Sequence, residues 1–201
     1  MSSRMNPVLA QTRREAADCR RCELWKLGTQ TVFGEGPTRG LMFVGEQPGD
    51  AEDLEGRPFV GPAGRLFREL LEEVGIPEDS VYVTNAVKHF KWRPAGKRRL
   101  HDKPDWGEMQ ACKHWLVLEL AAVKPKLVVC LGATAAQSLF GRSARVGKLR
   151  GQVLQLEHGE PALVTIHPSA VLRAGDQRKE RRAELKADLA LARKTLTSIA
   201  A

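Results

Sequence analysis

The sequence predicts an α/β fold with an open, largely parallel central sheet of about four strands flanked by helices. Short apolar runs rich in β-branched residues alternate with segments in which apolar residues recur at helical spacing. Such alternation is typical of parallel strands connected by helices that cover both faces of a sheet. The chain has 201 residues, of which 42% are hydrophobic and 28% charged, which fits one globular domain over residues 1–201.

The predicted strands are continuous apolar runs, as expected for strands that are buried on both faces. In chain order they are 41–44 (LMFV), 81–87 (VYVTNAV), 127–131 (LVVCL) and 162–166 (ALVTI). Open sheets of this kind bind ligands beyond the carboxyl ends of their strands. The residues that follow each run are therefore the first candidates for a site.

Helical segments separate and follow these strands. One apolar stripe at 3.6-residue spacing comprises Leu66, Phe67, Leu70, Leu71 and Val74. Further helices are predicted at 115–123, with Cys112 at the opening of that helix, at 133–140 and at 180–196. Residues 1–15 are expected to form a loosely held helix or tail.

Charge and composition favour a polyanionic partner. The formal net charge is +8 and the isoelectric point is near 9.6, and clustered Lys and Arg release counterions when they neutralise phosphates. Nucleic acid is the leading candidate. No apolar stretch approaches the ~20 residues that a membrane span needs, and the N-terminus has no signal-peptide core, so we expect a cytoplasmic protein without a membrane partner.

Unusual residues follow three of the predicted strands, and the second strand runs into a fourth such motif. The motifs are GEQPGD at 45–50, TNAVKHF at 84–90, GATA at 132–135 and HPSAVLR at 167–173. Taken singly, the glycines fit a tight turn, Asn85 fits turn hydrogen bonding and His167 fits a buried imidazole. Their occurrence together at strand ends instead predicts one crevice with convergent polar groups.

A basic segment, expected to be an insertion loop at 88–104, follows the second strand. The run KHFKWRPAGKRRLHDK holds seven Lys or Arg and one acidic residue. Lys97, Arg98 and Arg99 are suited to phosphates, and Trp92 could touch a base. His101 adds little to a phosphate clamp at neutral pH, so the residues alone favour a solvated loop in which this histidine is incidental.

Four cysteines are too few for a disulfide framework in a chain of this size. Cys19 and Cys22 form a CxxC pair, and Cys112 supplies a third soft ligand. Cys130 would complete a set of four, although a thiol inside a buried strand is an ordinary core residue. Zinc and an iron–sulfur cluster both remain open on these residues.

The ordered motifs GEQPG, PFVGPAGRLF, TNAVKH, GATA and HPSAVLR resemble those of the uracil-DNA glycosylase superfamily, and within it the iron–sulfur family 4 branch. The resemblance covers the chain from about Cys19 to the C-terminal helix. Family 4 usually reads GEAPG, whereas Gln47 stands here in the alanine position. Gln47 and the loop sequence KRRLH are similar to the X-type (UdgX) relatives, which read KRRIH and attach themselves covalently to the DNA.

The resemblance implies the uracil-DNA glycosylase fold and a pocket for a flipped base. Phe59 would stack on uracil, Asn85 would bind its O4 and N3 edge, and His167 would donate to O2 of the departing anion. Gln47 and Gly45 would line the same pocket.

The resemblance also implies DNA contacts outside the pocket. Leu172 and Arg173 are similar to the minor-groove wedge that fills the space of the flipped base. Leu172 alone equally fits a core residue at the start of a helix. Ser169, Lys97, Arg98 and Arg99 would contact the DNA backbone.

Glu46 and His101 carry the most specific expectation. In a glycosylase that turns over, Glu46 would orient water or stabilise the sugar cation. In the X-type case, Glu46 would hold one nitrogen of His101 while the other attacks C1′. Three functions follow: covalent capture through His101, turnover excision of the family 4 type, and a non-catalytic basic module with a structural metal.

Family 4 carries a cysteine at the position of His89. The resemblance therefore implies a [4Fe–4S] cluster on Cys19, Cys22, His89 and Cys112, with Cys130 as the substitute for His89. The implied partner is uracil-containing DNA, single- or double-stranded, with free uracil as product, and we expect a monomer.

Overall fold

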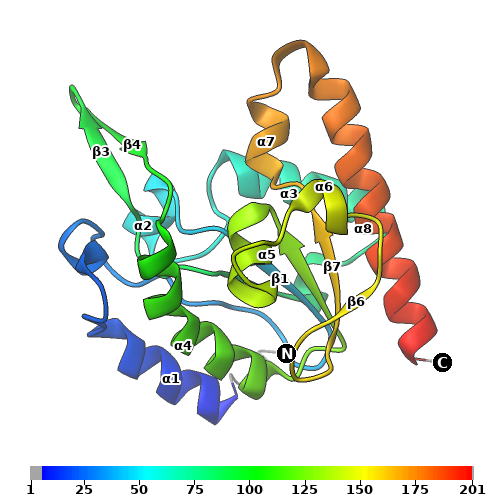
Figure 1. Cartoon of the computed structure of the whole chain (residues 1–201), viewed down its shortest axis with the longest axis horizontal. Helices are drawn as coiled ribbons and strands as arrows, with labels where there is room; N and C mark the ends of the chain where they lie inside the picture. Colours follow the sequence, from blue (N-terminus) through cyan, green and yellow to red (C-terminus); the bar gives the residue numbers. More distant parts are fainter. Residues whose placement is uncertain (1–5, 201) are drawn as a thin grey trace.

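The computed structural model describes residues 6–200, so part of the predicted N-terminal tail, residues 1–5, lies outside the described residues. A central sheet of five strands has the order β2-β1-β5-β7-β6 (Figure 1). Its strands are β1 Leu41–Gly45, β2 Val81–Asn85, β5 Leu127–Leu131, β6 Leu154–Gln155 and β7 Pro161–Thr165. Strands β2, β1, β5 and β7 are parallel, which confirms the predicted α/β class, and only β6 is antiparallel to its neighbour.

Helices cover both faces of the sheet, as Figure 1 shows. Met42 and Val44 of β1 point into a core with α1, α4 and α5, whereas Leu41 and Phe43 point into a core with α3, α7 and α8. The longer helices are α1 Pro7–Ala17, α3 Pro62–Glu73, α4 Trp106–Val123, α5 Ala133–Phe140 and α8 Arg178–Ala200. Short elements are η1 Glu23–Lys26, α2 Asp50–Glu55, η2 Glu78–Ser80, α6 Val146–Leu149, α7 Pro168–Leu172 and η3 Gly175–Gln177.

Three elements differ from the sequence-based expectations. Residues 7–15 are not loosely held, because they belong to α1, which buries Leu9 and packs on α4. The helix α4 begins at Trp106 rather than near Cys112, because Asp105 caps it and Glu108 completes a capping box. The strand β6 was not predicted, because two residues are too few to show a pattern of apolar residues.

The basic segment is a β-hairpin rather than a loop. Its strands are β3 Trp92–Ala95 and β4 Arg98–His101, and they pair antiparallel with Trp92 opposite His101. The hairpin projects from the body as the green ribbon on the left of Figure 1. Gly96, at its tip, has a φ of 60°, which glycine adopts without steric penalty.

No helix within residues 6–200 is both long enough and apolar enough to cross a membrane.

Candidate active site

A cavity of about 660 Å³ opens at the carboxyl ends of the parallel strands. Glu46, Asn85, Gly132 and His167 line it, and each lies within two residues of the end of a different strand. β1 lies between β2 and β5, so the strand order reverses here, and ligands of open α/β sheets bind at such switch points. The structure thus forms the crevice that the strand-end motifs predict.

Gly45 lets two cavity residues approach the backbone of β1. A Cβ atom at Gly45 would lie 2.3 Å from Oδ1 of Asn85 and 2.9 Å from Cζ of Phe59. Asn85, only 3% exposed, pairs with Gly45 in the sheet register. The buried amide and the ring therefore lie close together only because residue 45 has no side chain.

Phe59 is held in an uncommon backbone conformation with a φ of 59°. Its carbonyl oxygen accepts a hydrogen bond of 2.7 Å from Nη1 of Arg68. A Cβ at Gly64 would lie 1.6 Å from that same oxygen, so this position in the first turn of α3 requires glycine. The sequence reading missed both residues, although Gly64 belongs to the PFVGPAGRLF motif and Arg68 directly follows it.

His167 lines the cavity from the N-cap position of α7. Its Nδ1 accepts from the backbone N–H of Ser169 at 3.1 Å and lies 2.8 Å from the Ser169 hydroxyl oxygen. Burial lowers the pKa of His167 to about 4, although the Glu46 carboxylate opposes that shift. At neutral pH the ring is neutral, and with Nδ1 accepting from the Ser169 N–H, its proton is assigned to Nε2, where it can be donated.

Glu46 joins the body of the protein to the hairpin. Its Oε1 lies 3.0 Å from Nε2 of His101, and its Oε2 accepts a short hydrogen bond from the Thr134 hydroxyl. Burial disfavours the charged carboxylate, yet these two hydrogen bonds outweigh burial and lower the pKa of Glu46 to about 2. The structure brings His101 to Glu46 as predicted, whereas the part of Thr134, within GATA, was not foreseen.

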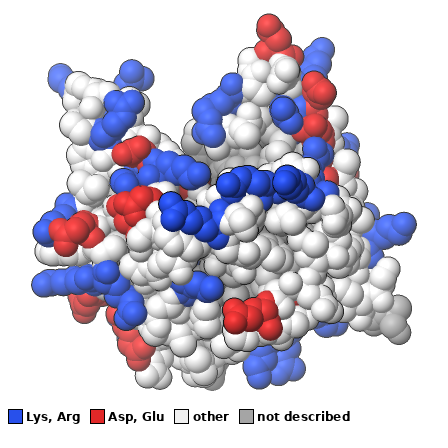
Figure 2. Space-filling model, in the orientation of Figure 1, with Lys and Arg blue, Asp and Glu red and all other residues white. Residues whose placement is uncertain are grey.

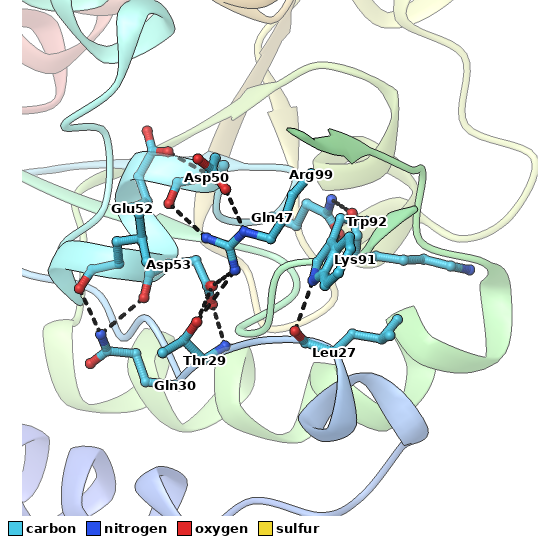
Figure 3. A network of polar contacts seen from close by, with 12 residues as sticks. Leu27, Thr29, Gln30, Gln47, Asp50, Glu52, Asp53, Lys91, Trp92 and Arg99 are labelled. Carbon is cyan, nitrogen blue, oxygen red and sulfur yellow. Dashed lines mark hydrogen bonds and ion pairs between the residues drawn. The ribbon is translucent and has the colours of Figure 1, made fainter. Parts of the chain in front are cut away.

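Gln47 fixes both strands of the hairpin where they leave the body (Figure 3). Its Nε2 donates to the carbonyl oxygens of Lys91 and Asp102, at 3.0 Å each. Its Oε1 accepts from the Lys91 N–H at 3.1 Å. Gln47 also lines the cavity, as expected, but its amide atoms are engaged by the hairpin.

The contacts of Arg99 differ from the expectation that it binds a phosphate. Its guanidinium pairs with Asp50 at 2.6 Å and with Asp53 at 2.7 Å (Figure 3). Asp53 is fully buried and also accepts two hydrogen bonds from Thr29. Arg99 therefore fastens the hairpin to α2, and sequence reasoning missed this because the two aspartates lie far away along the chain.

Other residues of the hairpin divide between packing and exposure. Nε1 of Trp92 donates to the Leu27 carbonyl at 2.8 Å, and the Arg99 guanidinium lies 5.7 Å from the Trp92 ring centroid. This favours packing for Trp92 over base contact. Lys97 and Arg98 are exposed and form no ion pair within residues 6–200.

A buried polar network contacts the backbone of Asn85, and sequence reasoning did not find it. Nζ of Lys88 donates to the Asn85 carbonyl at 2.7 Å and forms a short ion pair with Glu119. Both charged side chains are fully buried. Glu119 also accepts from the Tyr82 hydroxyl at 2.9 Å, and Thr84 donates to it at 3.0 Å. Each buried charge therefore has hydrogen-bond partners, as such pairs require.

Three of the predicted metal ligands are neighbours. Burial raises the pKa of Cys112 to about 12, with smaller contributions in the same direction from Cys22 and Cys19 and an opposing one from Lys88. His89 is buried, and its Nδ1 has no hydrogen-bond partner among the described residues. Within residues 6–200, however, no three His, Cys, Asp or Glu side chains are arranged to hold a metal ion.

Cys130 lies apart from this group. It is fully buried in β5, and burial alone raises its pKa to about 12. No other thiol contributes to that shift, which is the behaviour of a core residue. The backbone N–H of Lys88 donates to Sγ of Cys112 at 3.2 Å, so the chain passes this thiol at the residue next to His89, which favours His89 over Cys130 as the fourth member of the set.

A family model described as the uracil DNA glycosylase superfamily matches residues 33–190. The chain belongs to the uracil-DNA glycosylase superfamily. The matched segment includes all the strands and the cavity residues described above.

Several curated members of the superfamily are similar over most of their length. A type-4 uracil-DNA glycosylase from Archaeoglobus fulgidus is 37% identical over 86% of this chain and 87% of its own length. One from Thermotoga maritima is 41% identical over 77% of this chain and 78% of its own length. A type-5 enzyme from Pyrobaculum aerophilum is 28% identical over 81% and 76%. The comparisons do not reveal a specific relation to the X-type proteins.

The expected wedge residues lie beside the cavity on α7. Arg173 is exposed and lines the cavity, whereas Leu172 is half-buried and packs against the core formed with α3 and α8. Both the wedge and the core interpretation of Leu172 remain compatible with this position.

Proposed function

We propose that the protein excises uracil from DNA as a glycosylase of the type-4 kind. The observation that carries this proposal is the convergence of the Asn85 amide, the Phe59 ring and the neutral His167 in one cavity. The names of the type-4 relatives support it, and they favour turnover excision.

The proposed chemistry assigns one task to each residue. Phe59 stacks on the flipped uracil, and Asn85 reads the O4 and N3 edge with its amide. When the bond between C1′ and N1 breaks, the electron pair leaves with uracil, and Nε2–H of His167 stabilises the charge on O2. The ionised Glu46 carboxylate stabilises the sugar cation and orients the water that attacks C1′.

Covalent capture is a second candidate, and one distance favours it. Nε2 of His101 lies 3.0 Å from Oε1 of Glu46. A ring that donates its Nε2–H to this carboxylate keeps the lone pair of Nδ1 free. In this alternative Nδ1 forms the new bond to C1′ after uracil leaves, and Glu46 takes the Nε2 proton. An imidazole held in the site would compete with water through its high effective concentration.

One experiment separates these possibilities. The protein is mixed with a uracil-containing oligonucleotide, and free uracil is measured beside a denaturing gel of the DNA. Released uracil with an alkali-labile abasic strand supports turnover, whereas a retarded band that withstands heat and detergent supports capture. His101→Ser should abolish that band while leaving uracil release. If neither uracil nor a band forms, while the protein still binds DNA, the non-catalytic alternative holds.

We also propose that Cys19, Cys22, His89 and Cys112 hold a [4Fe–4S] cluster. The neighbouring thiols and the unpartnered Nδ1 of His89 support this set. The bound group would order the N-terminal segment and α4 rather than take part in base excision.

Iron content and visible absorbance of anaerobically purified protein test the ligand assignment. His89→Ala should lose iron, whereas Cys130→Ser should keep it. The reverse pattern would make Cys130 the ligand, and stoichiometric zinc in place of iron would remove the cluster from the proposal.

A further inference from the structure

The segment between α5 and β6 carries, besides Arg150, three cations that none of the assignments above uses. They are Arg142, Arg145 and Lys148, called here the basic ridge. All three are exposed, and none forms an ion pair with any carboxylate in the described part of the chain. Their charges are therefore available to a partner.

The basic ridge lies at the rim of the cavity. Val146, between Arg145 and Lys148 in the sequence, lines the cavity together with His101 and Arg173. In Figure 2 a row of Lys and Arg atoms crosses the surface over α6, below the notch between the hairpin and α7. A nucleic-acid strand that placed one nucleotide in the cavity would have the phosphates next to that nucleotide near this row.

The segment that carries the ridge is basic. No Asp or Glu occurs between Glu119 and Glu157, and the two carboxylates of α8 that reach this segment, Glu184 and Asp188, pair with Arg150 rather than with the ridge. The C-terminal helix is different, because there Arg181 and Arg182 pair with Glu184 and Glu73. An unpaired cation row binds polyanions, whereas paired cations mostly contribute to a solvated surface.

Internal contacts hold the backbone of the ridge in place. Nη1 of Arg145 donates to the carbonyl oxygens of Arg142 and Ala144, at 2.9 and 3.0 Å. At the far end, Arg150 pairs with Asp188 at 2.6 Å and with Glu184 at 3.2 Å on α8. The guanidinium of Arg142 lies 6.0 Å from the Trp106 ring at the start of α4. The segment is thus attached to α8 through Arg150 and lies against the start of α4 through Arg142, while the three side chains of the ridge are exposed.

We propose that the basic ridge binds the phosphate backbone of DNA on one side of the flipped nucleotide, while Lys97 and Arg98 of the hairpin bind it on the other. This inference rests on the proposed function for its choice of DNA as the polyanion. It assigns the ridge to affinity and position rather than to base selection, because phosphate contacts carry no sequence information.

The test measures the binding of a uracil-free single-stranded oligonucleotide by fluorescence anisotropy at several salt concentrations. The ridge variant is R142Q/R145Q/K148Q. The control variant, R14Q/K126Q/K194Q, loses the same charge from exposed positions on α1, before β5 and on α8, which no ion pair within residues 6–200 involves. Equal thermal unfolding temperatures for both variants would confirm that each remains folded.

Three lost phosphate contacts should flatten the slope of log Kd against log salt by about 2, since each contact on a single strand contributes about 0.7. Between about 50 and 200 mM salt, the unmodified protein should then lose on the order of 20-fold more affinity than the ridge variant. The control variant should keep the original slope. A charge-conserving variant, R142K/R145K/K148R, should keep it as well.

Equal slopes for the ridge and control variants would overturn the proposal, and so would a flattened slope in the charge-conserving variant. Uracil release is measured separately on uracil-containing DNA. If the unmodified protein releases no uracil, the proposed function is contradicted. If the slope of log Kd against log salt is still flattened in the ridge variant, the ridge remains a DNA-binding surface.

Discussion

The cavity floor and the hairpin contribute to the same site but are held in different ways. The floor residues are Asn85 and Gly45, which are part of the parallel sheet, and His167, which follows β7 at the N-cap of α7; helices pack on both sides of the sheet. His101 stands on a separate two-stranded sheet that Gln47, Arg99 and Trp92 attach to the body by a few polar contacts. Two-stranded hairpins are marginally stable by themselves. Changes in the floor should therefore abolish base excision, whereas changes at the hairpin attachment should affect only what depends on His101.

The largest effect is expected at the floor. His167→Ala removes the Nε2–H donor that faces the departing uracil, and loss of one such donor lowers rates by about 10²- to 10³-fold. Both uracil release and any covalent product should fall together in single-turnover assays. His158→Ala, an exposed histidine away from the cavity, is the matched control. A loss of the covalent product alone would contradict the assignment of His167 to the floor.

The pH dependence of stability should report the same residue. Because the folded pKa of His167 is about 4, against 6.5 for the free side chain, the unfolded chain binds a proton that the folded protein does not. The free energy of unfolding should therefore fall as the pH drops from about 6.5 to 4. The decrease should be at most about 3 kcal/mol, and solvent that reaches part of the ring makes it smaller. Urea titrations measure it, and His167→Gln should remove this component. An unchanged profile would contradict the lowered pKa.

A smaller effect is expected at the hairpin attachment. Arg99→Met leaves the buried carboxylate of Asp53 without its cation, although two hydrogen bonds from Thr29 remain. An unsatisfied buried group costs about 1–3 kcal/mol of stability. Arg98→Met, at the exposed neighbouring position, should change stability little. Thermal unfolding compares the two variants, and equal losses would show that Arg99 does not fasten the hairpin.

Gln47→Ala should give the smallest effect of the four. It removes three hydrogen bonds to the ends of the hairpin but no charge. We expect about a tenfold decrease in any product that requires His101, since one misplaced group changes a rate by at least that factor. Uracil release should remain near its original rate. A parallel loss of uracil release would instead place the Gln47 amide in base binding.

The sequence predicted the floor well because its signals are local. Strand ends are readable from apolar runs, and parallel strands bring Glu46, Asn85 and His167 to one edge whatever the details of packing. The same logic missed the fifth strand of the sheet, β6, because it is only two residues long. Gly45 and Gly64 could be noticed in the sequence, but only the structure shows what a Cβ atom would meet.

The hairpin was harder to predict for two physical reasons. Its strands contain Pro94 and many charges, so they lack the apolar alternation that marks a half-buried strand. The partners of Arg99 lie on α2, and a pairing across such a separation follows from tertiary structure rather than from spacing. Because Arg99 follows Lys97 and Arg98 in the sequence, it was interpreted as a phosphate ligand. The start of α4 was predictable, since Asp105 and Glu108 have capping-box spacing.

The way Gln47 holds the hairpin has a practical consequence for protein engineering. The contacts of Gln47, together with the bond from the Asp102 N–H to the Lys91 carbonyl, fix the distance between the two strands at the base. Trp92 and His101 form the first cross-strand pair above that base, and the turn around Gly96 lies at the opposite end. Insertions at Gly96 would therefore lengthen the hairpin away from His101. A fluorophore attached there would lie far from His101 but beside Lys97 and Arg98, the proposed phosphate contacts, which makes this turn an attachment point for a sensor of DNA binding.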